Sequence, residues 1–89
     1  MAYTINYTDI TNKGSIAIED NTTDTSTTLQ IPGRFTTDYG ALIGQNFLQL
    51  LENFSNSSAP ASPVAGQMWW DKTNNLLKVY NGTAFKTVS

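Results

Sequence analysis

The sequence predicts an α+β fold in which small antiparallel β-meanders pack on one amphipathic helix. Residues alternate between apolar and polar near both ends of the chain, and apolar residues recur at helical spacing between them. The length of 89 residues fits one small domain. We expect a single domain, 1–89, with four segments: N-terminal β strands and loop (1–33), a helix (37–55), a Pro/Ser linker (56–66) and a three-stranded meander (67–89).

The N-terminal segment has a period of two. Tyr3, Ile5 and Tyr7 fall on one face, which predicts a half-buried strand. An Asn-Lys-Gly turn signal follows, so a second strand can form a hairpin with the first. Pro32 and Gly33 end a third strand sharply. The expected elements are strands over 2–10, 15–19 and 27–31 and a polar loop over 20–26.

The helix is predicted by one apolar stripe with spacings of three and four residues. The stripe consists of Tyr39, Leu42, Ile43, Phe47, Leu50, Leu51 and Phe54. Thr36 or Thr37 can cap the first turn, and Asp38 suits the positive end of the helix dipole. The residues expected in the core are Phe47, Leu50, Leu51 and Phe54. Gly40 and Gly44, four residues apart, either permit close packing or belong to a loose first turn.

The C-terminal third has the strongest β signal. Prolines keep the linker before it extended. A four-residue loop at 72–75 would pair Asp71 with Leu76. Asn-Gly at 81–82 is the preferred dipeptide for a two-residue hairpin turn, which would pair Tyr80 with Thr83.

Side chains alternate across the meander, so it has two faces. The face expected against the helix holds Met68, Trp70, Leu77, Val79 and Ala84. The other face is mixed and holds Trp69, Leu76, Lys78, Tyr80 and Phe85. Either the N-terminal strands or the linker cover this mixed face, or another chain does. The candidate interface residues are Phe35, Trp69, Leu76, Tyr80 and Phe85.

Composition argues against an enzyme. Cysteine and histidine are absent, which excludes the usual zinc sites and catalytic triads. Only 13% of residues are charged, about half the usual share of roughly 25%, and 13 Thr, 9 Asn and 7 Ser supply most of the polarity. The net charge of −2 does not attract nucleic acid. We expect no catalytic residues, no cofactor, no metal, no nucleic-acid partner and no membrane segment.

Several motifs resemble one family in their order and spacing. They are Asp38-Tyr39-Gly40, the run from Gln45 to Phe54, Ala59-Pro60, Pro63-Val64-Ala65-Gly66-Gln67-Met68-Trp69-Trp70-Asp71 and the run from Thr73 to Phe85. The opening Met1-Ala2-Tyr3-Thr4-Ile5-Asn6 and the stretch from Asp24 to Gly33 continue the likeness. Together they resemble the N-terminal module of tail-fibre-like virion structural proteins of contractile-tailed bacteriophages, notably cyanophages.

This resemblance implies a non-enzymatic virion protein, located in the phage tail or another external structure. It would act as a tail-fibre or baseplate-type attachment or assembly module through oligomeric contacts. The implied partners are other virion proteins and the chain itself, with a trimer favoured. Two alternatives stay open. One is a small carbohydrate- or receptor-binding module with Trp69 or Tyr80 as a stacking platform, and the other is a capsid decoration protein.

Overall fold

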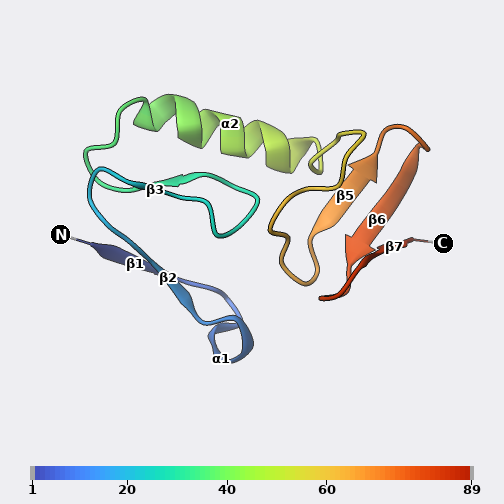
Figure 1. Cartoon of the computed structure of the whole chain (residues 1–89), viewed down its shortest axis with the longest axis horizontal. Coiled ribbons are helices and arrows are strands. Elements are labelled where there is room, and N and C mark those ends of the chain that lie inside the picture. The colour runs from blue at the N-terminus through green and yellow to red at the C-terminus, as the bar shows by residue number, and fades with distance from the viewer. Residues whose placement is uncertain (1, 89) are drawn as a thin grey trace.

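Two helices and three small antiparallel sheets make up the α+β fold that the computed structural model describes for residues 2–88 (Figure 1). The predicted fold class is therefore confirmed. Met1 and Ser89, the outer ends of the predicted segments 1–33 and 67–89, lie outside the described residues. The elements are β1 (Tyr3–Asn6), α1 (Ile10–Lys13), β2 (Ser15–Ile18), β3 (Thr23–Asp24), β4 (Ile31–Pro32), α2 (Tyr39–Leu51), β5 (Met68–Asp71), β6 (Leu76–Tyr80) and β7 (Phe85–Thr87).

The first two strands form the expected hairpin. β1 and β2 are antiparallel, and Tyr3 lies opposite Ile18. The connection is longer than a simple turn, because one turn of helix, α1, precedes Gly14. Gly14 has a φ of 76° and its N–H donates to the carbonyl oxygen of Ile10 at 2.9 Å, which ends that turn.

The third predicted strand is shorter and later than expected. The paired residues are Ile31 and Pro32, which lie opposite Asp24 and Thr23. The preceding Thr27 instead accepts a hydrogen bond from the Leu29 N–H on its own Oγ1, a local turn that competes with a strand. The loop predicted over 20–26 accordingly contains the partner strand, β3.

The helix α2 is shorter at both ends than the predicted 37–55. Its N-cap is Asp38, with a φ of 62° and no side-chain capping bond. Thr36 is not the N-cap residue, and its hydroxyl instead points to the carbonyl oxygens of Gly33 at 2.8 Å and Thr22 at 3.1 Å, which share its one proton. At the other end Asn53 and Phe54 both adopt positive φ, and the Phe54 N–H donates to Gln49 at 2.8 Å, which ends the helix.

The segment after the helix is hydrogen bonded along the meander. Asn56 forms a parallel bridge with Asp71, and the Trp70 N–H donates to the carbonyl oxygen of Asn53 at 2.9 Å. Further along, Thr28 Oγ1 donates to Ala61. The linker is therefore an ordered part of the fold that lies against one side of β5.

The meander has the predicted order β5-β6-β7, but only one of its two predicted registers. Asp71 lies opposite Leu76, as expected. The second register is wrong by two residues, because Tyr80 lies opposite Phe85 rather than Thr83. The Asn81 side chain accepts the N–H groups of Thr83 and Ala84, which closes a four-residue loop instead of a two-residue turn.

The helix lies over the β3–β4 pair, and its closest strand is β4. The expectation that the apolar face of the meander lies against the helix stripe is not what the structure shows. The meander instead sits beyond the C-terminal end of α2 (Figure 1). The turn at Asn53 and Phe54 directs the chain away from the helix at that point.

The described residues form a flat body. Its extents are 44 × 30 × 16 Å and its radius of gyration is 14.3 Å, against about 12 Å for a compact domain of this length. Seen down the shortest axis, the helix and the sheets lie side by side (Figure 1). The molecule is therefore flat, with its helix and sheets arranged side by side more than stacked into two full layers.

The buried core is correspondingly small and divided. Among the described residues the buried hydrophobic side chains are Ile18 and Trp69, and Pro32 is also fully buried. Ile18 belongs to the N-terminal hairpin, whereas Trp69 belongs to the meander. A stable domain normally buries its apolar side chains between two packed layers, and this chain supplies only part of the second layer.

Candidate functional site

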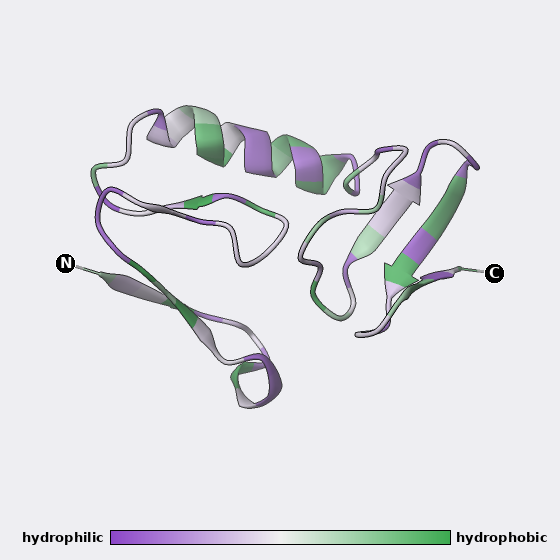
Figure 2. Cartoon of the chain, in the orientation of Figure 1, coloured by the Kyte–Doolittle hydropathy of each residue, from purple (hydrophilic) through white to green (hydrophobic). Residues whose placement is uncertain are grey.

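Exposed apolar area is the main surface feature of the described residues. The accessible surface is 5935 Å², roughly 700 Å² above the roughly 5,200 Å² expected for a folded monomer of this mass. Large hydrophobic side chains that leave 38% or more of their surface exposed are Ile5, Ile10, Phe35, Tyr39, Phe47, Leu48, Leu50, Leu51, Met68, Leu76 and Val88. In Figure 2 the hydrophobic residues are spread along the molecule rather than gathered at one centre.

One side of α2 concentrates this exposed area. We define the outer face of α2 as Gly40, Gly44, Phe47, Leu48 and Leu51, which share one side at helical spacing. Phe47 is 65% exposed and Leu51 is 78% exposed. A Cβ placed on Gly40 or Gly44 would meet nothing within 4 Å. No residue from Tyr39 to Leu51 is charged, so this exposed face lacks the polar character usual for a helix side in water.

The predicted core positions on the helix are therefore partly wrong. Phe47, Leu50 and Leu51 are exposed, while Phe54 is half-buried. The buried side of α2 centres on Asn46 instead. Its Nδ2 donates to the carbonyl oxygen of Gln30 at 2.7 Å, and its Oδ1 accepts the Gln30 N–H at 3.1 Å. These two bonds orient the helix so that Asn46, rather than Phe47, Leu50 or Leu51, is its most buried side chain.

The mixed face of the meander forms an aromatic cluster. The rings of Trp69 and Phe85 meet edge to face with centroids 5.3 Å apart, and the Tyr80 and Phe85 rings are 5.1 Å apart. Trp69 Nε1 donates to the carbonyl oxygen of Asn56 at 3.2 Å. Trp69 is only 7% exposed, so its own chain, including the linker, covers it. Tyr80 and Phe85 stay half-buried.

A buried ion pair lies beside this cluster. Lys78 Nζ is 2.9 Å from Asp71 Oδ2 and 4.9 Å from the centroid of the Trp69 ring. Asp71 also accepts hydrogen bonds from the Asn74 side chain and from the Thr73 and Asn74 N–H groups. The Asn74 side chain, followed by Lys78, lowers the Asp71 pKa to about 2. This carboxylate holds the β5–β6 turn and is unsuited to accept a proton near neutral pH.

The two remaining interface candidates lie apart from the cluster. Phe35 precedes α2, has a φ of 63° and is 79% exposed. Leu76 lies at the start of β6 and is 40% exposed. The structure therefore brings Trp69, Tyr80 and Phe85 together and places Phe35 at the other end of the helix.

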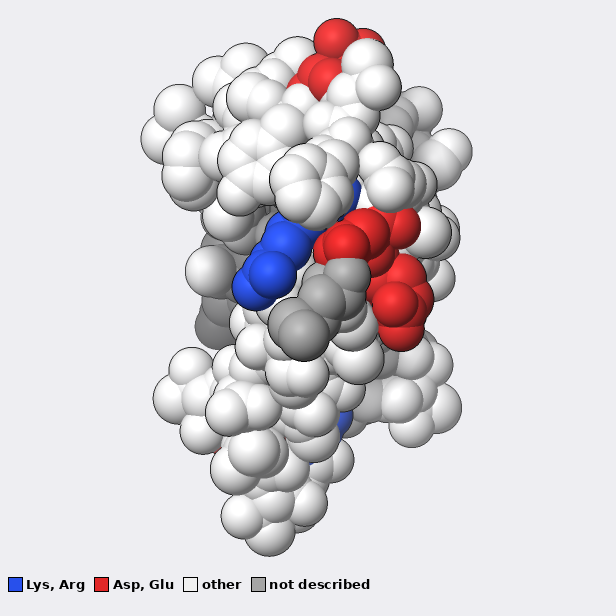
Figure 3. Space-filling view, turned by 90° about the vertical axis from the view of Figure 1, so that its left-hand side faces the viewer, with Lys and Arg blue, Asp and Glu red and all other residues white. Residues whose placement is uncertain are grey.

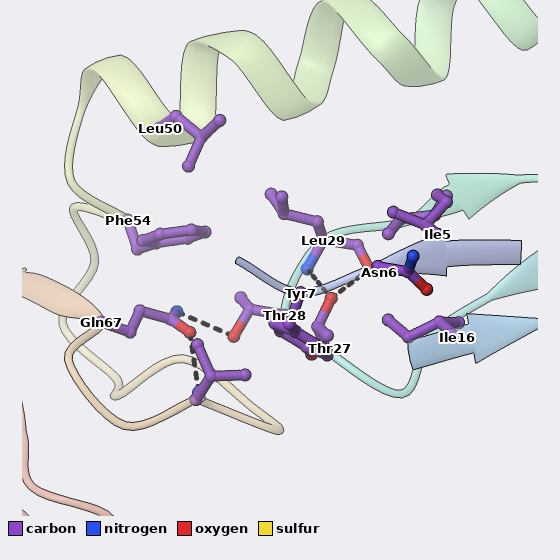
Figure 4. A pocket seen from close by; sticks show the side chains of 12 residues that line it. Ile5, Asn6, Tyr7, Ile16, Thr27, Thr28, Leu29, Leu50, Phe54 and Gln67 are labelled. Carbon is purple, nitrogen blue, oxygen red and sulfur yellow. Dashed lines mark hydrogen bonds between the residues drawn. The ribbon is translucent and has the colours of Figure 1, made fainter. Parts of the chain in front are cut away.

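A largely apolar cavity lies between the N-terminal hairpin and the end of α2 (Figure 4). Its volume is about 230 Å³, larger than the ~150 Å³ that accommodates benzene in an engineered core. Its lining residues are Ile5, Asn6, Tyr7, Ile16, Thr27, Thr28, Leu29, Ile31, Leu50, Phe54, Val64 and Gln67. Gln67 Nε2 donates to Thr28 Oγ1 at 2.9 Å across one wall. The lining has no carboxylate and no basic side chain, so it suits an apolar group.

Charged groups are sparse on the surface. On the side shown in Figure 3, acidic and basic side chains occupy a few places and uncharged residues cover the rest. Within residues 2–88, no group of three or more acidic side chains is arranged to hold a metal ion. Neither helix in this part of the chain has the length and apolar character needed to cross a membrane.

The sequence contained a signal for the exposed helix face that periodicity alone missed. Helical periodicity shows that apolar residues share a side of a helix, but it does not show whether that side faces the core or the solvent. The absence of charge on every side of α2 is the better signal, because a helix with only one buried side normally carries charges opposite it. Comparisons with protein-family models, with curated proteins and with solved structures gave no match.

Proposed function

We propose that this chain is a non-enzymatic virion structural protein of a contractile-tailed bacteriophage. In this proposal it is a tail-fibre or baseplate-type attachment or assembly module that acts through oligomeric protein–protein contacts. The resemblance of its motifs to such modules supports this class of protein. The single observation that carries the mechanism is the flat body, whose accessible surface exceeds that of a compact monomer and whose large hydrophobic side chains are widely exposed.

The size of this excess fits an interface. A standard protein–protein interface buries about 800 Å² on each partner, close to the roughly 700 Å² by which the chain exceeds a compact monomer. Neighbouring subunits would cover the large hydrophobic side chains that the isolated chain leaves exposed. The low charge content also favours assembly, because few charged side chains would lose their hydration when subunits associate.

The carbohydrate-binding alternative has less support from the geometry. A stacking platform needs an open ring face, and Trp69 is 7% exposed. Tyr80 is half-buried against Phe85. A capsid decoration protein would use the same kind of contacts and differ in its place on the particle.

Location on the virion tests the proposal. Antibodies against the purified chain would be applied to phage particles and viewed by electron microscopy. We expect gold label on the tail or the baseplate. Label on the head alone would favour the decoration protein, and particles without label whose lysate contains the protein would contradict a virion role.

A further inference from the structure

We infer that the outer face of α2 is a self-contact surface, against which the same face of a second copy of this chain packs. This inference rests on the proposed assembly function and specifies its partner and its contact. It follows from three observations: the spacing of the residues, their exposure, and the lack of charge on the helix.

The spacing fits a helix-to-helix seam. Gly40, Gly44, Phe47 and Leu51 are separated by four, three and four residues, the alternation that keeps one side of a helix against a partner helix. Leu48 flanks the seam on the same side. The two glycines are open to solvent and lack a Cβ, so a partner backbone can approach closely at the start of α2 while Phe47 and Leu51 fill the space further along.

The fold of the single chain does not use this seam. α2 is held on its other side, where Asn46 bonds the backbone of Gln30. Each glycine inside a helix lowers stability relative to alanine, and at Gly40 and Gly44 no described neighbour requires the missing Cβ. A closely packed partner helix would account for these two glycines, because its backbone would occupy the space that a side chain would fill.

Charge and area point to a second copy as the partner. No side chain from Tyr39 to Leu51 is charged, so two copies of this face meet without like-charge repulsion or ion desolvation, although each chain has a net charge of −2. Phe47, Leu48 and Leu51 are 65%, 59% and 78% exposed, and a contact between two copies of this face would remove their apolar surface from water on both chains at once. One face of this kind can serve around a twofold or a threefold axis.

Sedimentation equilibrium of the full chain tests the inference through a matched pair of variants. Leu51→Lys places a charge on the seam, at a helix end where a positive charge is favourable for folding. Ile10→Lys places the same charge on an exposed isoleucine in the N-terminal hairpin connection. We expect Leu51→Lys to raise the dissociation constant of self-association by roughly tenfold or more, and Ile10→Lys to leave it unchanged. Circular dichroism checks that both variants fold.

A cross-linking experiment gives a second, independent result. The chain has no cysteine, so a single introduced thiol reports one position. Under mild oxidation we expect Gly44→Cys, near the middle of the seam, to form an inter-chain disulfide much faster than Ile10→Cys.

Two outcomes would overturn the inference. One is a chain that self-associates equally well with Leu51→Lys, or cross-links equally at both positions, which would assign the contact to another surface. The other is a monomer at high concentration. Neither outcome changes where antibodies find the protein on the particle, so a failure here is distinguishable from a failure of the proposed virion function.

Discussion

The side-chain amide of Asn46 bonds both backbone groups of Gln30, the carbonyl oxygen at 2.7 Å and the N–H at 3.1 Å. A loop residue without a strand partner thereby has its polar groups satisfied by a helix side chain. The same two bonds determine which side of α2 faces the chain and which side faces outward.

Replacing Asn46 with alanine should therefore destabilise the fold. Both Gln30 backbone groups would lose their partner in a part-buried position, and we expect a decrease of about 1–2 kcal/mol in the free energy of unfolding. Urea titration followed by circular dichroism measures it. Gln45→Ala, on the exposed side of the same helix, is the control and should stay within about 0.5 kcal/mol of the wild type. Equal effects of the two variants would contradict this role for Asn46.

Trp69 should be a structural residue of the meander. Trp69→Ala removes a buried ring that contacts Phe85, and we expect a loss of about 3–5 kcal/mol. Trp69→Phe keeps a ring but loses the Nε1 bond to Asn56, and we expect the bond itself to account for about 1 kcal/mol. Unfolding curves for the two variants measure both terms. A Trp69→Ala chain as stable as the wild type would mean that the ring is not packed as described.

Replacing Gly33 and Gly44 with alanine should change the stability of the fold in opposite directions. A Cβ on Gly33 would overlap the carbonyl oxygen of Glu19 and would lie 2.9 Å from that of Thr22. Since backbone atoms cannot move aside cheaply, Gly33→Ala should lose at least about 2 kcal/mol. Gly44 lies inside a helix with open space around it, so Gly44→Ala should gain about 0.5–1 kcal/mol in the stability of the monomer. Thermal and urea unfolding at low protein concentration would show both changes.

Stability should depend on pH through Asp71. Its pKa is lowered to about 2 from an ordinary 3.8, mainly by the Asn74 side chain and then by Lys78. Between these values the unfolded chain binds more protons than the folded chain, so stability rises with pH and is fully present above about pH 4. We expect the urea midpoint to fall as the pH decreases from 4 to 2. In Asp71→Asn this contribution should be missing, and an unchanged slope in that variant would refute the assignment.

Self-association should respond little to salt. A contact between uncharged helix faces has no ion pairs to screen, so its dissociation constant should change by less than about twofold between ~0.05 and ~0.5 M NaCl. Sedimentation at the two salt concentrations measures this. A strong weakening by salt would indicate that charged side chains, which α2 lacks, carry the contact.

Local signals in the sequence were sufficient to predict pairings between residues that lie close together in the chain. The period of two predicted the hairpin of β1 and β2, and the loop length predicted that Asp71 lies opposite Leu76. The predicted β6–β7 register was wrong because the Asn81 side chain accepts hydrogen bonds from two N–H groups of the loop. The Asn-Gly dipeptide alone does not indicate these bonds.

Tertiary partners explain the other differences. The rotation of α2 depends on the bonds of Asn46 to Gln30, sixteen residues away, and no periodicity contains that information. Four of the five candidate interface residues share one face of the predicted meander, and Phe35 lies near the start of the helix. Whether Trp69 is exposed enough to contact another chain depends on the path of the linker, which brings the Asn56 carbonyl oxygen to the Trp69 indole.

The parallel bridge between Asn56 and Asp71 makes the meander asymmetric. It occupies the outer side of β5, whereas β7 has no strand on its outer side within residues 2–88. Of the two edges, β7 is therefore the more open to pairing with a further backbone. Lys86, whose side chain is exposed on that strand, is the type of residue that discourages uncontrolled growth at such an edge.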